Sequence, residues 1–299
     1  MACAQVSKRS YHPIEPRSLT VHKLQFIKKM EEVSFLNGKT RLYGIVGDPI
    51  EQVRSPEMVT HELHSRGINA VLLPIHLKTA DFEQVLPRLL EVANLDGLIF
   101  TIPFKARAMQ FATQVGPQAR AVNAINVIAR KADNSWAGEI FDGLGCVEAF
   151  RRRGYALKDQ RVMLIGLGGA GSAICAAVAA ECPKAMQIFD LDETRCKNMA
   201  DAIHRISPQT LVTVGEPTTK DMDVLLNASP VGMLGDNRLP INVTRFSNDL
   251  IVFDAIVKPE QTPMLALAES FGCRTVRGRE MMRGQISKIV DYLVNTAAG

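Results

Sequence analysis

The sequence predicts an α/β fold of two domains: a substrate-binding domain with a mainly parallel sheet and a Rossmann dinucleotide-binding domain, with a cleft between them. Short apolar runs alternate with helical patterns along the chain, which is typical of parallel sheets. A glycine-rich turn follows one of these runs in mid-chain, over residues 162–171. The length of 299 residues exceeds the usual size of a single core and leaves room for two domains.

The first forty residues differ from the rest of the chain. Residues 1–40 are polar, basic and aperiodic, and Pro13 and Pro16 exclude an early helix. We expect an extension outside the catalytic fold, with a short helix over 22–33. A targeting peptide is the alternative, but acidic residues such as Glu15 and a modest Ser and Arg content argue against it.

The domain limits follow from these patterns. We expect the substrate-binding domain to comprise 41–142 together with 279–299, and the Rossmann domain to comprise 143–278. A helix over 143–153 is expected to join them. Two domains joined in this way usually move relative to each other, so we also expect the cleft to close.

In the first half of the chain, ordered structure is expected to begin near Leu42. Pro56 stands at a first helical position behind Ser55, and Thr79 is a plausible cap for the next helix. The expected elements are strands at 42–46, 70–75 and 98–101, a helix after Ser55-Pro56, and a helix over 79–93.

The second half repeats the alternation. Its expected strands lie at 162–165, 187–189, 224–227 and 251–254, with helical stretches between them. A parallel sheet of this kind binds a nucleotide at the carboxyl edge of its strands.

The glycine-rich turn is a dinucleotide motif. Gly166 allows the tight turn out of the strand, Gly168 lets backbone amides approach a pyrophosphate, and Gly171 lets the following helix pack close to the sheet. Gly169 and Ala170 lie between them. The motif alone is weak, and a glycine-rich structural turn is the alternative.

The next strand strengthens the motif. It ends at Asp190, close to the 20-residue offset expected of an acid that binds the adenosine ribose. Asp192 is a second acid beside it, and no Arg or Lys stands between the two. Two carboxylates repel a 2′-phosphate, so the sequence predicts NAD as the cofactor rather than NADP.

Composition limits the partners and the compartment. The net charge of +4 is spread over charges of both signs, which indicates neither a nucleic-acid partner nor a membrane surface. No apolar run is long enough for a membrane span, and no signal peptide is evident. The six cysteines form no metal-like cluster, so we expect reduced thiols, no metal and a cytoplasmic protein.

Between Tyr43 and Leu293 the chain has six motifs in order: Gly47-Asp48-Pro49-Ile50 ending in Ser55-Pro56, Thr101-Ile102-Pro103-Phe104-Lys105, Ala121-Val122-Asn123, Phe141-Asp142-Gly143, Asn227-Ala228-Ser229-Pro230-Val231-Gly232-Met233, and 278–285. In these motifs and in their order the chain resembles the shikimate/quinate dehydrogenase family. The resemblance implies reversible oxidation of a ring secondary alcohol, such as shikimate, quinate or a related cyclic hydroxy acid, and a place in aromatic amino acid biosynthesis.

The resemblance implies that Lys105 and Asp142 form the catalytic pair. An alcohol loses hydride only as its hydroxyl proton is removed, which requires a positioned base. A desolvated lysine can accept or relay that proton while a carboxylate orients it. An exposed lysine and a simple helix cap are the structural alternatives.

The resemblance also implies contacts to the substrate from two amides and two hydroxyls. These are Asn123 and Gln285, at the ring hydroxyls, and Thr101 and Ser55. Each is otherwise a turn or helix-surface residue, although a polar group in an apolar strand environment needs a partner.

The nicotinamide end of the cofactor is implied to lie at the turn after the 224–227 strand. The residues expected there are Asn227, Ser229, Pro230 and Met233, with Gly278 opposite. A core methionine is the alternative for Met233.

Several positions depart from the family pattern on the substrate side. The family carries two serines that bind the substrate carboxylate, whereas Val53-Arg54-Ser55 supplies only the second. Ile99 stands where the family has an Asn, two residues before the Thr at the end of the strand. Ile140-Phe141 stands in place of the family's Asn-Thr before the catalytic Asp, and Val257 stands in place of its Tyr after Asp254. The pocket is therefore more apolar than the family's. Shikimate is then a poor substrate, and quinate or a modified shikimate fits better unless Arg54 or Arg107 replaces the missing contact.

The sequence thus predicts an NAD-dependent dehydrogenase that acts on a small cyclic hydroxy acid, and it leaves a homodimer open. One alternative is a redox-sensing NAD-binding module whose pocket has lost catalysis. A folate-type dehydrogenase is another, against which the Asn123 and Asp142-Gly143 motifs argue.

Overall fold

The computed structural model describes residues 36–298, with side chains as far as Thr296. The expected helix over 22–33, the targeting peptide and most of the N-terminal extension lie outside the described residues. Residues 41–298 contain the two sheets and all the candidate site residues.

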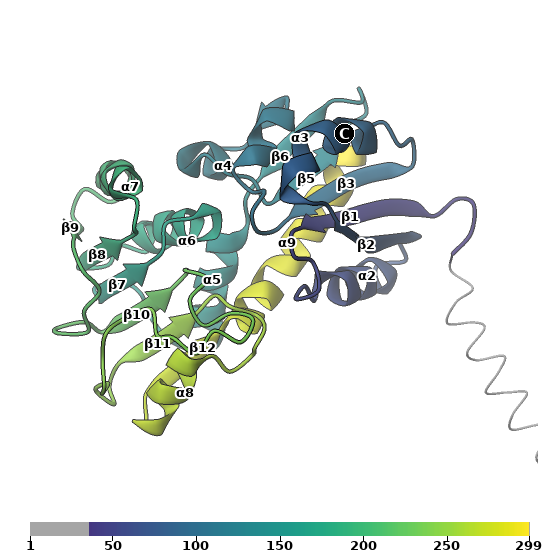
Figure 1. Cartoon of the computed structure of the whole chain (residues 1–299). Coiled ribbons are helices and arrows are strands. Elements are labelled where there is room, and N and C mark those ends of the chain that lie inside the picture. The colour runs from purple at the N-terminus through teal and green to yellow at the C-terminus, as the bar shows by residue number, and fades with distance from the viewer. Residues whose placement is uncertain (1–35, 299) are drawn as a thin grey trace, which may run out of the picture. The chain divides into compact units, whose positions relative to one another are not determined.

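The first sheet has the strand order β2-β1-β3-β5-β6-β4 (Figure 1). Its strands are β1 (Arg41–Gly47), β2 (Ala70–His76), β3 (Leu95–Phe100), β4 (Gln114–Val115), β5 (Val127–Arg130) and β6 (Trp136–Glu139). β1 is parallel to β2 and β3, as the alternation predicted, whereas β5 is antiparallel to β3 and β6. The sheet is therefore mixed, because β5 and β6 follow one another as a hairpin without a crossover helix.

The second sheet is parallel throughout, with the order β12-β11-β10-β7-β8-β9. Its strands are β7 (Arg161–Ile165), β8 (Ala185–Phe189), β9 (Leu211–Val214), β10 (Val224–Asn227), β11 (Ile251–Asp254) and β12 (Arg274–Arg277). Counted along the chain this is the 3-2-1-4-5-6 order of the Rossmann fold, whose switch point lies between the first and fourth strands. The predicted fold class is confirmed, and the domain limits stay a prediction.

The helices and short helical turns lie between most of these strands, but in the described chain none lies between β10 and β11, where the sequence predicted a helical stretch. They are α2 (Ser55–Ser65), η1 (Thr79–Asp81), α3 (Phe82–Leu90), η2 (Arg107–Phe111), α4 (Pro117–Val122), α5 (Asp142–Arg152), α6 (Gly169–Ala180), α7 (Glu193–Ile206), α8 (Pro263–Ser270) and α9 (Gly278–Ala298). One expected cap is wrong: the Thr79 hydroxyl donates to Asp48 Oδ2 at 2.7 Å, and a turn of 3₁₀ helix precedes α3.

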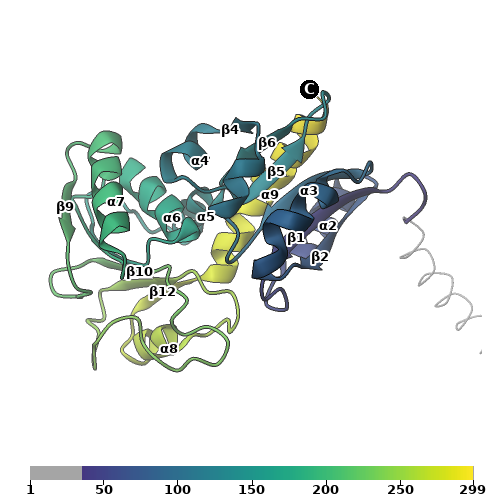
Figure 2. The same ribbon diagram turned by 45° about the horizontal axis from the view of Figure 1, so that its top comes forward.

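Two long helices connect the sheets. α5 follows the first sheet and packs along both α6 and α9, and α9 runs from β12 back across β5 and β3 of the first sheet (Figures 1 and 2). Gly143 and Gly145 permit this packing, because a Cβ on either would overlap the backbone of α6 or α9. The last helix therefore brings its N-terminal turns to the edge where both sheets end.

The central strands of both sheets are buried on both faces. Leu98 and Phe100 of β3 belong to the apolar cluster under α3, while Ile99, between them, points to the opposite cluster formed with α2 and α9. Alternate side chains of a strand point to opposite faces, so β3 is buried along its whole length. The loop that follows β3 is thereby held on a rigid strand.

Candidate active site

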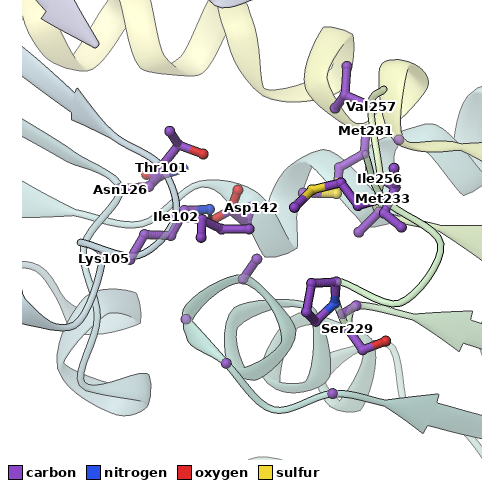
Figure 3. A pocket seen from close by; sticks show the side chains of 18 of the residues that line it. Thr101, Ile102, Lys105, Asn126, Asp142, Ser229, Met233, Ile256, Val257 and Met281 are labelled. Atoms are coloured by element: carbon purple, nitrogen blue, oxygen red, sulfur yellow. Dashed lines mark hydrogen bonds and ion pairs between the residues drawn. The ribbon is translucent and has the colours of Figure 1, made fainter. Parts of the chain in front are cut away.

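A cavity of about 1090 Å³ lies at the carboxyl ends of the strands of both sheets. The turns after β1, β3, β7, β8, β10 and β11 line it, together with the start of α9. Figure 3 shows Lys105, Asp142, Thr101 and Asn126 on one side, with Met233, Ile256 and Val257 across the cavity. One hollow thus contains the glycine-rich turn and the candidate catalytic pair.

Lys105 and Asp142 form a buried ion pair in this cavity. Lys105 Nζ lies 2.6 Å from Asp142 Oδ2, and the two side chains are 14% and 4% exposed. Lys105 stands in the turn after β3, and Asp142 is the first residue of α5. Lys105 retains donor capacity beyond this bond, since an ammonium has three N–H groups. The pair can take up a proton from a hydroxyl placed beside Nζ if Nζ passes one of its own protons to Asp142, so it can act as a proton relay.

The backbone around Lys105 fixes its position. Its carbonyl accepts from the Ile125 amide at 2.9 Å, and a Cβ on Gly169 would lie 2.9 Å from Lys105 Cβ. The first residue of α6 must therefore be small for the lysine to stand where it does. This places the catalytic pair directly beside the dinucleotide turn.

The amide predicted at Asn123 is not part of the cavity. Asn123 ends α4 in the left-handed conformation, with φ of 52°, and does not belong to the lining. Asn126, which immediately precedes β5, lines the cavity instead. It donates to Gln285 Oε1 at 3.2 Å and accepts from the Phe141 amide at 3.0 Å.

The other predicted substrate contacts do line the cavity. They are Ser55, Thr101 and Gln285. The Ser55 hydroxyl donates to the Met282 sulfur at 3.7 Å, and that sulfur is a weak acceptor. Since Asn126 donates to the Gln285 oxygen, the Gln285 nitrogen keeps its donors for a ligand.

The glycine-rich turn fits a pyrophosphate. Gly166 has φ of 92°, and a Cβ on Gly171 would overlap the Gly166 carbonyl, so neither position accepts a larger residue without a shift. A Cβ on Gly168, by contrast, would meet nothing within 4 Å, because that residue faces the open cavity. The turn leads into the N-terminus of α6, where free amides and the helix dipole favour an anion.

The acid at the end of β8 is tied to this turn. Asp190 Oδ2 accepts from the Leu167 amide at 2.6 Å, and Oδ1 accepts from the Asp192 amide at 3.0 Å. Asp192 caps α7 by accepting from the Thr194 and Arg195 amides. Both acids line the cavity, at the place expected for the adenosine ribose.

A cation that the sequence did not reveal lies beside the two acids. Arg195 Nη1 is 3.7 Å from Asp190 Oδ1, and its Nε is 3.4 Å from Asp192 Oδ2. No basic residue stands between the acids in sequence, but the first turn of α7 returns Arg195 to them, three positions after Asp192. The local charge is therefore −1 rather than −2.

A buried network holds the turn after β10, which carries the predicted nicotinamide contacts. Asn227 Oδ1 accepts from the Ser229 amide at 3.0 Å and from its hydroxyl at 2.7 Å, and Asn227 Nδ2 donates to Asp254 Oδ1 at 3.2 Å. Thr262 donates to the second Asp254 oxygen at 2.7 Å. Ser229, Pro230, Met233 and Gly278 line the cavity, while Asn227 supports the turn from behind.

Burial raises the pKa of Asp254 to about 6, although bonds from Ile256, Thr262 and Asn227 oppose the shift. Its native pKa exceeds its unfolded one, so this group stabilises the fold below about pH 4 and loses that contribution as the pH rises through 6. A rise in pKa of this size corresponds to roughly 2–3 kcal/mol in the free energy of unfolding. We predict that Asp254→Asn, which keeps the shape, is more stable than wild type at pH 8 but not at pH 4, as measured by urea denaturation.

The matched control for that comparison is Asp133→Asn. Ser135 lowers the pKa of the exposed Asp133 carboxyl, so its replacement should change stability in the opposite direction. A constant difference between Asp254→Asn and wild type at both pH values would contradict the prediction.

Arg107, one of two proposed replacements for the missing carboxylate contact, is excluded. It forms an ion pair with Glu83, lies over the Phe82 and Phe104 rings, and does not line the cavity. Arg54 does line the cavity, with an exposed side chain.

The described part of the chain offers neither a metal cluster nor a membrane-spanning helix. Residues 36–298 contain no group of three or more His, Cys, Asp and Glu side chains arranged to hold a metal ion. Among the helices that the structure describes, none is both long and apolar enough to cross a membrane.

A Rossmann sheet, a glycine-rich turn and a buried Lys–Asp pair in one cavity define the class: an oxidoreductase that uses a nicotinamide dinucleotide. Residues 45–128 match the family described as the shikimate dehydrogenase substrate binding domain. The chain is 30% identical over 257 residues to the shikimate dehydrogenase (NADP(+)) of Rhodospirillum rubrum, covering 84% of this chain and 90% of that one. The chain therefore belongs to the shikimate dehydrogenase family, and the predicted family and enzyme class are confirmed.

Solved structures agree with this fold. Shikimate 5-dehydrogenase from Listeria monocytogenes, in complex with shikimate and NAD, superposes with a TM-score of 0.75 at 24% identity, over 87% of this chain and 93% of that one. Quinate dehydrogenase from Corynebacterium glutamicum, in complex with NAD, gives a TM-score of 0.73 at 25% identity, over 86% and 94%. The relatives use NAD or NADP, so a nicotinamide dinucleotide is supported but NAD in particular is not.

Proposed function

We propose that the protein catalyses the reversible, NAD-dependent oxidation of a ring secondary alcohol to the ketone. The observation that carries this proposal is the 2.6 Å Lys105–Asp142 pair, buried in the same cavity as the glycine-rich turn. When bound, the oxidised nicotinamide supplies an acceptor for hydride. The rest of the chemistry falls to side chains of this chain.

The Lys105–Asp142 pair takes up the hydroxyl proton. As the carbinol C–H bond breaks and its hydrogen leaves with both electrons, the O–H bond breaks, its proton passes to the pair, and a C=O bond forms. Asn126 and Gln285 orient neighbouring hydroxyls of the substrate. Retention of this pair argues against the alternative of a non-catalytic NAD-binding module.

The test is an initial-rate assay of NAD and NADP reduction with shikimate, quinate and their aminated analogues. Turnover of at least one ring alcohol supports the proposal. Tight NAD binding without turnover of any of them contradicts it and favours the non-catalytic module.

The preference for NAD is part of the proposal. Asp190 and Asp192 lie where a 2′-phosphate would stand, and Arg195 is engaged with both of them. We predict that Asp192→Ser raises the ratio of kcat/KM for NADP to that for NAD by about tenfold, because one repelling charge is lost and Arg195 is released. Serine still caps α7, so the helix should be unaffected.

The control for the cofactor prediction is Asp201→Ser. This substitution removes an exposed carboxylate from the same helix, away from the cavity. An equal shift in Asp192→Ser and Asp201→Ser would mean that overall charge, rather than the ribose site, sets the preference.

A further inference from the structure

The half of the cavity that holds the substrate has one continuous apolar wall. It is formed by side chains of the apolar cluster between the first sheet, α2 and α9: Val53, Ile99, Val257, Met282, Ile286 and Ile289. Ile99 is 6% exposed and Met282 is 7% exposed, so these side chains belong to the packed core. Figure 3 shows Val257 across the cavity from Thr101 and Asn126. A ligand beside the catalytic pair must place its far end against this wall.

The polar groups of this half are uncharged apart from the catalytic pair. The hydroxyls of Ser55 and Thr101 and the amides of Asn126 and Gln285 line it. Such groups match the hydroxyls of a ligand, which both donate and accept. None of them carries a positive charge that would offset the cost of burying a carboxylate.

The cations of the cavity lining are engaged or lie at its rim. Lys105 is paired with Asp142, Arg195 with two acids, and Arg238 with Asp236. Arg54 and Lys258 also belong to the lining, with exposed side chains. Aliphatic residues, Val53 and Val257, precede them in sequence and form the wall itself. A carboxylate against the wall would therefore lose water without gaining a cation as its partner.

We propose that the site selects a neutral polyhydroxylated alcohol, whose end remote from the reacting carbinol carries an uncharged group such as an ester or a hydroxymethyl in place of a carboxylate. This inference rests on the proposed function for the reacting end of the ligand. It departs from the hydroxy acid that the family resemblance implied.

The experiment compares shikimate with its methyl ester, which differ only at the remote end, where the ester has no charge and one more methyl group. Calorimetric binding to the wild-type protein with NADH present does not depend on turnover. We expect the ester to bind at least tenfold more tightly than the acid. Equal or tighter binding of the acid, or binding of neither, would overturn the inference.

Two variants locate the selectivity. Val53→Ser and Ile99→Asn place polar groups in the wall, and each should shift the acid-to-ester affinity ratio at least tenfold towards the acid. Val92→Ser, a half-exposed position outside the cavity, is the matched control and should leave the ratio unchanged. Unchanged ratios in both wall variants would also overturn the inference.

The rim cations give a further decisive comparison. If Arg54→Ala or Lys258→Ala weakens binding of the acid at least tenfold while sparing the ester, a carboxylate is recognised at the rim and the inference is wrong. Small and equal effects of these two variants on the binding of both ligands support the inference. The rate assay tests the proposed function independently of this inference. The proposed function is contradicted if both ligands bind but neither is oxidised.

Discussion

Replacing Lys105 by alanine is expected to lower kcat for alcohol oxidation by about 10²- to 10⁴-fold while the affinity for NAD changes little. The expectation follows from the geometry, because Nζ donates to Asp142 at 2.6 Å and is the group that can pass the hydroxyl proton on to that carboxylate. The residues proposed to hold the cofactor are different ones, those of the turn from Gly166 to Gly171. Stopped-flow rates and calorimetric NAD binding measure the two quantities separately.

Folding must be controlled in this experiment. The Asp142 side chain is 4% exposed, and removing its partner leaves a buried carboxylate without a counter-charge, a change that typically costs about 3–5 kcal/mol. Lys105→Arg keeps the charge, but a guanidinium does not give up its proton, so this variant should fold normally and still be inactive. Lys158→Ala, an exposed position, is the matched control. Turnover within a few-fold of wild type in Lys105→Arg would show that Lys105 does not handle the proton.

The fold could be predicted because its signals are local. Alternating runs located β1 to β3 in the first sheet and β7, β8, β10 and β11 in the second, and the glycine spacing located the glycine-rich turn. β4, β9, β12 and the hairpin of β5 and β6 were missed, because polar or small residues interrupt their apolar runs. A long periodic element can be read from sequence more easily than a short pair.

The site was predicted less completely, because it depends on distances across the fold. Two similar tripeptides end at Asn123 and Asn126; the sequence pointed to Asn123, whereas Asn126, which directly precedes a strand, is the one that lines the cavity. That position before an apolar run was a usable signal. No sequence signal indicated the hydrogen bond between Asn227 and Asp254, because only the pairing of β10 with β11 brings the two residues together.

The glycine turn gives the second large effect. Gly168→Ala should weaken NAD binding by about ten- to a hundredfold, the loss of roughly one charge-assisted hydrogen bond to phosphate. Its φ of −67° and ψ of −173° suit alanine, and the added methyl points into open cavity, where the pyrophosphate would approach the backbone. The same substitution should stabilise the unliganded protein by about 0.4–1 kcal/mol, because alanine has fewer unfolded conformations. The affinity for NAD, measured by calorimetry, should therefore fall while the free energy of unfolding, measured by urea denaturation, rises.

This opposition distinguishes a binding defect from a folding defect. Gly38→Ala is the matched control, because a Cβ there also meets nothing within 4 Å but the residue lies outside the cavity lining. It should leave NAD affinity unchanged. Gly171→Ala provides the contrast, since its Cβ would overlap the Gly166 carbonyl and must lower stability and affinity together. If Gly168→Ala binds NAD as wild type does, phosphate does not approach the backbone at this turn, and the cofactor must lie elsewhere along the cavity.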